Sequence, residues 1–214
     1  MKRKPWMPKV VQQALKTEML RVAGSGNVTT VLEYGGGGST LWFLDHGCQV
    51  TTVEHNAQWA RRIGRAAKGV PGSLLLLHHP RPYHRATFPL PANAWDIVIV
   101  DGRDRVKCTA EAIRVCKPGG LVVLDDSSRN KYAKAHARFQ LAGFTSERFG
   151  IDKPTAPNGK RVADFYRKPV TQRETKTPLE FVLANLPPGE PCPHDTDGDG
   201  NCQHCHRDGG CPVE

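Results

Sequence analysis

The sequence feature that most constrains the fold is a run of four glycines at residues 35–38. Residues 30–32 (Thr-Val-Leu) precede it as a short apolar, β-branched segment, which is typical of a buried strand. Because glycine has no Cβ, the run predicts a sharp turn whose backbone can lie directly against a ligand. Ser39 or Thr40 is expected to cap a helix over residues 41–44, and the first backbone amides of that helix would face the ligand.

A second predicted strand, residues 49–53, ends at Glu54, which lies 21 residues after Glu33. In nucleotide-binding α/β sheets, an acid at the end of the second strand binds the hydroxyl groups of an adenosine ribose. The dinucleotide fingerprint G-x-G-x-x-G/A does not fit, because Thr40 or Leu41 would occupy its last small position. The pattern that fits is E-x-G-x-G, which begins at Glu33. The alternative is an ordinary glycine-rich turn that binds no ligand.

Helix-like and strand-like segments alternate along the first 168 residues. Apolar periodicity and capping residues predict helices at residues 7–23, 56–67, 105–116 and 131–141, and strands at residues 73–78, 95–101 and 121–124, with a turn at residues 117–120. Residues 144–149 and 162–166 are expected to form a terminal antiparallel pair. This order predicts the α/β fold class, with a doubly wound, Rossmann-like, mostly parallel sheet that ends in an antiparallel strand pair.

Carboxylates stand at several predicted strand ends. Ligands of doubly wound sheets bind beyond the carboxyl ends of the parallel strands. The acids expected to share that edge are Glu33, Glu54, Asp101, Asp125 and Asp126.

Four motifs within residues 28–168 resemble one group of class I S-adenosylmethionine-dependent methyltransferases. They are EYGGGGST from Glu33, VEH up to His55, VDGRDR around Asp101, and LDDSSR up to Arg129. Members of the group carry EYGxGGST, VEH, VDGRxR and LDNSxR at these places and in this order. The resemblance implies the same fold and S-adenosylmethionine as cofactor, but it does not identify the methyl acceptor.

The resemblance also implies roles for individual residues. In the group, the acid before the glycines faces the methionine moiety and the acid after the second strand binds the ribose. The implied cofactor-binding residues are Glu33, Tyr34, Gly35, Gly37, Ser39, Thr40, Glu54, His55 and Asp101, and the implied catalytic residues are Asp101, Arg103 and Asp126. Two places depart from the group: Asp126 replaces an asparagine, and His78 and His79 stand where an acid would bind the adenine.

Methyl transfer from a sulfonium is an in-line displacement, so the main task of the protein is to position the nucleophile. Asp101, at the end of the fourth predicted strand, is expected to act as a general base or to anchor the acceptor. Arg103 and Arg105 follow on the same loop and can bind an anionic or hydroxylated acceptor. The alternative is that these arginines pair with Asp104.

Three of the acids also resemble the metal-binding set of catechol-type O-methyltransferases. In those enzymes an acid after the fourth strand and an acidic or amide pair after the fifth hold a divalent cation against the substrate oxygens. Asp101, Asp125 and Asp126 match this set, and their hard oxygen ligands suit magnesium. The alternative is that Asp125 or Asp126 caps the helix that follows.

Charge is distributed unevenly along the chain. The net charge is +9, but residues 190–214 carry six acids and one base, so the remaining residues carry a net +14. This excess can attract an anionic acceptor or nucleic acid, or it can be solvated surface. Nucleic acid is not favoured, because no basic run is interleaved with aromatic residues and no DPPY-like or NPPY-like tetrapeptide occurs. No membrane-spanning or signal-like segment is found, and a cytoplasmic location is expected.

The end of the chain predicts a separate small module rich in Cys, His and Asp. Residues 1–168 are expected to form the methyltransferase-like domain, residues 169–190 a linker with a short helix, and residues 191–214 a tail that needs a metal ion to fold. The expected zinc ligands are Cys192, Cys202, Cys205 and Cys211, with His194 as an alternate. A D-x-D-x-D-G run also resembles the start of a calcium loop, but His206 stands in place of its final glutamate. Disulfides or disorder are the remaining alternatives.

The sequence therefore predicts transfer of a methyl group to an oxygen or nitrogen of a small-molecule or glycan-like acceptor. Two alternatives stay open: a non-catalytic nucleotide-binding protein, and a nucleic-acid-directed methyltransferase that uses the basic surface. The sequence does not predict an oligomeric state.

Overall fold

The computed structural model describes residue 5 and residues 7–79, 82–152 and 160–170. Apart from residues 169 and 170, the predicted linker and the predicted metal-binding tail lie outside the described residues. Within the described part of the chain, no helix combines the length and the apolar character needed to cross a membrane.

Helices and strands alternate as the sequence predicts. Their bounds are α1 Lys9–Ala23, β1 Thr30–Tyr34, α2 Gly38–Asp45, β2 Gln49–Glu54, α3 Ala57–Ala66, β3 Ser73–His78, η1 Tyr83–Thr87, β4 Trp95–Val100, α4 Arg105–Val115, β5 Cys116–Leu124, η2 Asn130–Tyr132, α5 Ala133–Leu141, β6 Thr145–Asp152 and β7 Lys160–Arg167, where η denotes a short 3₁₀ helix.

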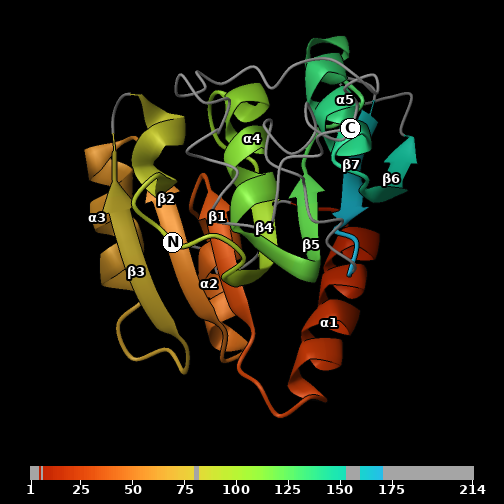
Figure 1. Cartoon of the computed structure of the whole chain (residues 1–214). Coiled ribbons are helices and arrows are strands. Elements are labelled where there is room, and N and C mark those ends of the chain that lie inside the picture. Colours follow the sequence, from red (N-terminus) through yellow and green to blue (C-terminus); the bar gives the residue numbers. More distant parts are fainter. Residues whose placement is uncertain (1–4, 6, 80–81, 153–159, 171–214) are drawn as a thin grey trace, which may run out of the picture. The chain divides into compact units, whose positions relative to one another are not determined.

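Seven strands form one sheet in the order β3-β2-β1-β4-β5-β7-β6 (Figure 1). Strands β1 to β5 pair in parallel, whereas β7 pairs antiparallel with both β5 and β6. The predicted mostly parallel sheet with a terminal antiparallel pair is therefore confirmed. The chain winds outward in one direction from β1 and in the other from β4, so the crevice beyond these two strands is the switch point where such sheets bind ligands.

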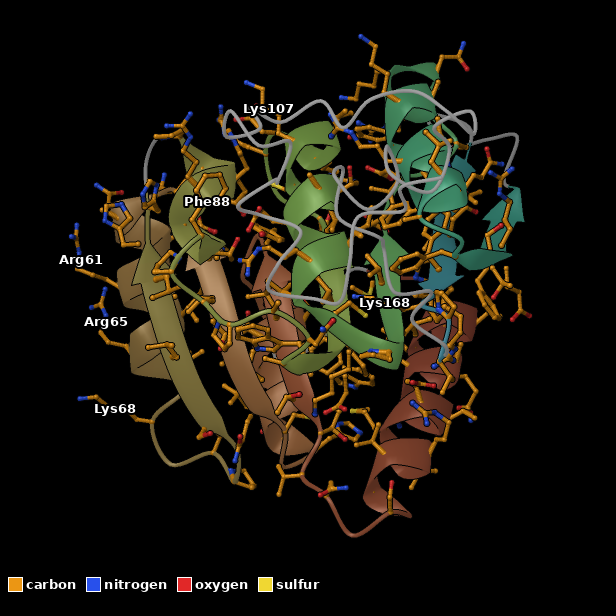
Figure 2. The ribbon with its side chains drawn as sticks, viewed as in Figure 1. Arg61, Arg65, Lys68, Phe88, Lys107 and Lys168 are labelled. Atoms are coloured by element: carbon orange, nitrogen blue, oxygen red, sulfur yellow. The ribbon has the colours of Figure 1, made fainter. Side chains whose placement is uncertain are left out.

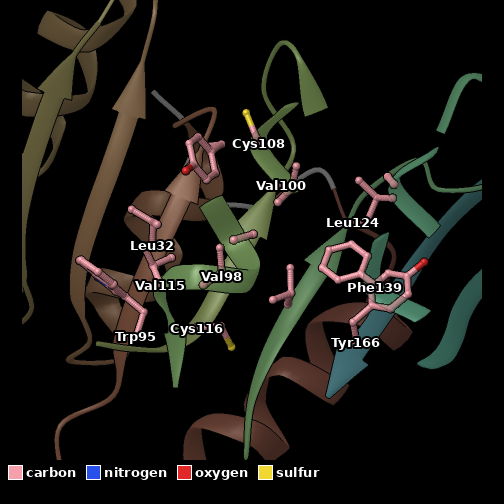
Figure 3. Packing of buried hydrophobic residues seen from close by; sticks show 14 of the residues in the cluster. Leu32, Trp95, Val98, Val100, Cys108, Val115, Cys116, Leu124, Phe139 and Tyr166 are labelled. Carbon is pink, nitrogen blue, oxygen red and sulfur yellow. The ribbon is translucent and has the colours of Figure 1, made fainter. Parts of the chain in front are cut away.

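Two hydrophobic cores lie on opposite faces of the sheet. All six residues of β4 are buried, which is expected of a parallel strand covered by helices on both faces. Ile97 packs into the core that contains α1 and α2, whereas its neighbour Val98 packs into the core that contains α4 and α5. Figure 3 shows the second core, where the ring of Phe139 stacks on that of Tyr166 with centroids 4.0 Å apart. Because successive side chains of β4 point to opposite faces of the sheet, this one strand packs against the helices on both faces.

The residues that cap α3 and α2 agree with the sequence prediction for α3 and differ from it for α2. Asn56 caps α3 as predicted, because its side chain accepts the backbone N–H of Trp59 at 2.9 Å. The prediction that Ser39 or Thr40 caps α2 is wrong, since the capping position is Gly37 and both residues lie inside the helix. Their hydroxyl groups instead bond to a buried acid below the glycine turn.

The strand β5 also begins earlier than predicted. The predicted turn at residues 117–120 is an irregular part of the strand, and the helix before it ends at Val115. Two non-local pairings extend the strand: Cys116 pairs with Trp95 of β4, and further on Gly119 donates its N–H to the carbonyl of Lys168 while Lys168 donates its N–H to the carbonyl of Gly120, both at 3.0 Å. Because both pairings are non-local, the local sequence does not reveal them.

Candidate functional site

The carboxyl ends of the parallel strands meet at one edge, which we call the rim. Backbone hydrogen bonds past the strand ends join successive loops: Gly35 to Val53 at 2.9 Å, Asp101 to Tyr34 at 3.0 Å and Asp125 to Val100 at 3.3 Å. The loops after β1, β4 and β5 are therefore neighbours, and the glycine turn lies directly against the end of β2.

The glycine turn has one side packed against the protein and one open side. Gly35 has a φ of +95°, and a Cβ at that position would lie only 2.7 Å from the Cα of Gly102. A side chain at Gly35 is therefore excluded both by backbone strain and by the neighbouring loop. At Gly37, by contrast, the nearest atom to an added Cβ is the indole nitrogen of Trp59 at 3.8 Å. A ligand can approach the backbone on this open side.

Trp59 borders the open side of the turn. Its indole nitrogen donates a hydrogen bond to the carbonyl of Gly36 at 2.7 Å, and the guanidinium of Arg62 lies 5.9 Å from its ring centroid. The sequence predicts a helix over residues 56–67 but assigns Trp59 no role in the site. Its place in the first turn after the Asn56 cap was the available signal, because that end of the helix faces the rim.

Glu33 is fully buried beneath the turn. Its two carboxylate oxygens accept hydrogen bonds from the hydroxyl groups of Ser39 and Thr40, and the Thr52 hydroxyl lies 3.3 Å from Oε2. The Thr40 oxygen in turn accepts the N–H of Gly37 at 2.9 Å. Desolvation outweighs these hydroxyl contacts and raises the pKa of Glu33 to about 7. Glu33 thus stabilises the turn from below, and its predicted contact with a cofactor stays a prediction.

Two tyrosines support the rim from the core. The side chain of Tyr34 is fully buried and its hydroxyl lies 2.6 Å from that of Thr87. Any contact of Tyr34 with a ligand can therefore come only from its backbone. Tyr83 donates its hydroxyl to the carbonyl of Val53 at 3.0 Å, and a Cβ on Gly102 would lie 2.2 Å from that hydroxyl oxygen. The sequence motifs do not include Tyr83, so its role is seen only in the structure.

Glu54 is the first residue in a series of polar contacts along the rim. Its Oε1 accepts the N–H of Asn56 at 2.7 Å and lies 2.9 Å from Nδ1 of His55. Nε2 of His55 accepts a hydrogen bond from Nε of Arg103 at 2.9 Å. These partners assign His55 the neutral tautomer that carries its proton on Nδ1. A cavity of about 320 Å³ adjoins these polar contacts and is lined by Glu54, His55, Asn56, Gln58, Trp59 and Arg62.

The end of β3 places two histidines beside the polar contacts of Glu54 and His55. Nε2 of His78 lies 3.3 Å from the carbonyl of His55, and the backbone N–H of His79 donates to the carbonyl of Glu54 at 3.0 Å. Within the described residues, the buried Nδ1 of His79 has no hydrogen-bond partner.

Three carboxylates converge on Arg105. Its guanidinium lies 2.6 Å from Oδ1 of Asp101, 3.8 Å from Oδ2 of Asp125 and 3.7 Å from Oδ2 of Asp126. Among the described residues, no group of three acidic, histidine or cysteine side chains is arranged to hold a metal ion. The predicted magnesium site therefore gains no support from the geometry, because an arginine stands between its proposed ligands. The alternative that Arg105 pairs with Asp104 is replaced by these three contacts.

The helix-capping alternative for the same acids is also wrong. The capping position of η2 is Arg129, and that of α5 is Tyr132. Asp126 instead adopts a left-handed backbone conformation with φ of +52° and accepts a hydrogen bond from the guanidinium of Arg129. This conformation, which aspartate tolerates better than most residues, turns the chain after β5.

Asp101 holds its proton more tightly than an ordinary aspartate. Partial burial and the neighbouring Asp125 carboxylate raise the pKa of Asp101 to about 8, although Arg105 opposes the shift. Burial also raises the pKa of Asp125, and the two carboxyl groups are hydrogen-bonded to each other. The protonation of each carboxyl group therefore depends on that of the other. About a third of the Asp101 side chain remains exposed, so it is accessible from the rim.

Basic side chains gather on the outer side of α3. Arg61, Arg65 and Lys68 project away from the sheet in Figure 2, at spacings that place them on one helix face. Lys107 lies in the first turn of α4, directly after the rim loop, and Phe88, which follows η1, is about half exposed at 52%. The basic side chains are thus spread over the surface and are not confined to the cavity beside Glu54.

Replacing Glu33 with glutamine should flatten the pH dependence of stability. The pKa of Glu33 is about 7 in the folded protein against 4.5 ordinarily, so the fold binds this proton more tightly than the unfolded chain does. The resulting stabilisation is complete below about pH 4.5 and is lost as the pH rises to about 7, by on the order of 3 kcal/mol. Thermal melts at about pH 5 and pH 8 should show a larger loss of Tm for the wild type than for Glu33→Gln.

The control for this measurement is Glu147→Gln, which removes an exposed glutamate of β6. It should follow the wild-type pH dependence. Parallel curves for the wild type and Glu33→Gln would show that Glu33 has an ordinary pKa.

No protein-family model matches the chain, and no curated protein matches it. Solved structures do resemble it. A methyltransferase-like protein from Silicibacter pomeroyi is 24% identical, with 78% of this chain and 91% of that chain covered and a TM-score of 0.52. Cofactor-bound Rv0187 from MTB is 23% identical, with 77% and 83% covered and a TM-score of 0.53. A SAM-dependent O-methyltransferase from Thermotoga maritima is 15% identical, with 74% and 67% covered and a TM-score of 0.51. At these identities the likeness shows the fold alone, a Rossmann-like α/β sheet shared with class I methyltransferases.

Proposed function

We propose that this protein is an S-adenosylmethionine-dependent methyltransferase acting on an oxygen or nitrogen of a small-molecule or glycan-like acceptor. The observation that carries the proposal is the continuity of the site at the switch point of the sheet. Trp59 borders the open side of Gly37 and also lines the cavity beside Glu54. One ligand can therefore contact both the glycine turn and the acid at the end of β2. The four motifs and the shared fold support the same proposal.

The residues at the rim fit the parts of this cofactor, which supplies a methyl group on a positively charged sulfur. Glu54 is the acceptor for the ribose hydroxyls, because both of its described contacts use Oε1 and its side chain also lines the cavity. The open backbone at Gly37 suits the methionine moiety. Ser39 and Thr40 act through Glu33, which they bind, and hold the turn in place.

The acceptor side of the proposed site is the loop after β4. Asp101 can take a proton from an acceptor hydroxyl or amine, since its raised pKa makes it a stronger base than an ordinary aspartate. Arg103 is exposed and bonds to His55 through Nε, so its terminal nitrogens are in reach of an anionic or hydroxylated acceptor. Asp126 acts indirectly, through the arginines that it contacts.

Two other functions are separated from this one by simple measurements. A non-catalytic nucleotide-binding protein would bind S-adenosylmethionine without forming S-adenosylhomocysteine with any acceptor. A nucleic-acid-directed enzyme would use the basic face of α3, and its activity would fall steeply with salt. Panels of phenols, glycans, nucleotides, peptides and RNA, with product detection, distinguish the three.

Glu54→Ala should weaken S-adenosylmethionine binding at least tenfold. A carboxylate that accepts hydrogen bonds from ribose hydroxyls contributes about 1.5–3 kcal/mol, and tenfold corresponds to about 1.4 kcal/mol. Calorimetric titration measures the effect. Glu54→Gln keeps an oxygen for the N–H of Asn56, so it separates loss of the ribose contact from collapse of the loop. Glu147→Ala is the charge-matched control, and an unchanged affinity in folded Glu54→Ala would argue against the ribose site.

Asp101→Asn should abolish turnover and leave cofactor affinity within about twofold. The amide cannot accept a proton, whereas the turn and the Glu54 cavity lie on other strands. In the wild type the rate should rise as the pH passes through about 8, because Asp101 must be deprotonated to act as a base. S-adenosylhomocysteine formation with the acceptor found in the panel is the readout. Turnover that survives the substitution would exclude Asp101 as base.

We also propose, from the sequence alone, that residues 191–214 bind one zinc ion through Cys192, Cys202, Cys205 and Cys211, with His194 as a substitute ligand. Structural zinc contributes on the order of 10 kcal/mol of apparent binding free energy, enough to order a segment without a core. Elemental analysis of the full chain, purified without added metal, should find about one zinc per chain and less than a tenth of that after Cys202→Ser with Cys205→Ser. Calcium is measured in the same samples.

The control for the zinc measurement is Cys48→Ser, which changes a buried core cysteine and should leave the zinc content unchanged. Zinc removal should not alter the melting of the α/β domain. A zinc content near zero, with all four tail thiols freely reactive, would contradict the proposal.

A further inference from the structure

Arg105 reaches the acids through an unusual start to α4. Asp104, at the capping position of the helix, has a left-handed backbone with φ of +48° and ψ of +34°. The chain therefore turns sharply between the rim loop and the helix, and Arg105 is the first helical residue. Its side chain is only 11% exposed, although arginine usually extends into solvent.

The guanidinium of Arg105 donates to oxygens of both rim loops. In the loop after β4 it bonds to the carbonyl of Gly102 at 3.1 Å, to the carbonyl of Asp101 at 2.8 Å and to the carboxylate of Asp101 at 2.6 Å. In the loop after β5 it bonds to the carbonyl of Asp125. The ring of Tyr132 lies 5.6 Å from the guanidinium carbon. All three guanidinium nitrogens are therefore engaged.

The oxygens around Arg105 are the kind that a hard divalent cation would take. Three carboxylates and three backbone carbonyls surround the guanidinium, distributed over its three nitrogens, and oxygen ligands of this kind bind magnesium or calcium where they converge on one point. Here they face N–H donors that carry a permanent positive charge. A second arginine, Arg129, bonds to Asp126 from outside. Two guanidinium groups thus already lie against the three carboxylates and offset most of their charge.

We propose that Arg105 is the resident cation of this cluster and takes the place of a divalent ion between the loops after β4 and β5. Arg105 is a positioning residue: it holds Asp101 against the loop that carries Asp125. One consequence rests on the function proposed above, namely that methyl transfer at this rim needs no divalent metal. A second does not: among the described residues these acids are not arranged to hold a metal ion while Arg105 stands between them, and removing the guanidinium should let them close around a cation.

Manganese titration of the full chain, followed by electron paramagnetic resonance, tests the proposal. The wild type should show no manganese binding that depends on Asp125. Arg105→Ala should bind manganese at least tenfold more tightly than the wild type, and Arg105→Ala with Asp125→Asn should lose that gain. Metal bound by the tail is common to all these proteins and cancels in the comparison. Arg129→Ala is the control, because it removes an arginine from the same cluster but leaves Arg105 in place.

Two results would overturn the proposal: wild-type manganese binding that weakens in Asp125→Asn, or a folded Arg105→Ala protein that binds manganese no better than the wild type. If Arg105→Ala does not fold, the wild type and Asp125→Asn are compared alone, and equal binding supports the proposal. A role of Arg105 that was only structural would change the melting temperature without creating a manganese site.

Whether the proposed methyltransferase function fails is measured independently of the role of Arg105. A protein that binds no S-adenosylmethionine refutes the methyltransferase proposal, while the manganese result still decides the role of Arg105. Where an acceptor is found, adding magnesium should leave the wild-type rate within about twofold.

Discussion

The close approach of two backbones, at Gly35 after β1 and at Gly102 after β4, is the contact on which the candidate site depends. A Cβ on Gly35 would lie 2.7 Å from the Cα of Gly102, and a Cβ on Gly102 would strike the hydroxyl of Tyr83. Because neither loop carries a side chain at this point, the loop with Asp101 lies directly against the glycine turn. Tyr83 also donates a hydrogen bond to the end of β2. The ends of β1, β2 and β4 are therefore in contact at the switch point, where the strand order reverses.

The acids at this rim are compensated in three different ways, and their chemistry differs accordingly. Glu33 has only hydroxyl dipoles around it, so burial dominates and its pKa rises to about 7. Glu54 accepts a backbone N–H and contacts a neutral histidine. Asp101 pairs with the guanidinium of Arg105, but burial raises the pKa of both Asp101 and its neighbour Asp125. Carboxyl groups whose surroundings separate their proton affinities are typical of sites that divide the roles of binding and of acid–base chemistry.

The order of helices and strands could be predicted because it depends on local patterns. Apolar periodicity, the Asn56 cap and the buried run of β4 act over a few residues and are visible in the sequence. The errors occur where distant groups compete with local ones. Neither Ser39 nor Thr40 is the capping residue of α2: both hydroxyls bond to Glu33, and the Thr40 oxygen accepts the N–H of the capping residue Gly37. The start of β5 depends on pairing of Cys116 with β4 and of the following glycines with Lys168, and local sequence contains neither contact.

For the candidate site, the position of a residue relative to its strand is enough to predict which side chains reach the rim. An acid that ends a parallel strand, such as Glu54, and a loop residue that follows one, such as Asp101, must lie at the carboxyl edge whatever the strand order. Only the tertiary structure decided what these side chains contact. Residues 31 and 97 become partners because β1 lies beside β4 in the sheet, and this non-local pairing sets the loops against each other. Arg105 therefore faces three carboxylates rather than its neighbour Asp104, because the electrostatic environment of a side chain depends on the loops that surround it in space.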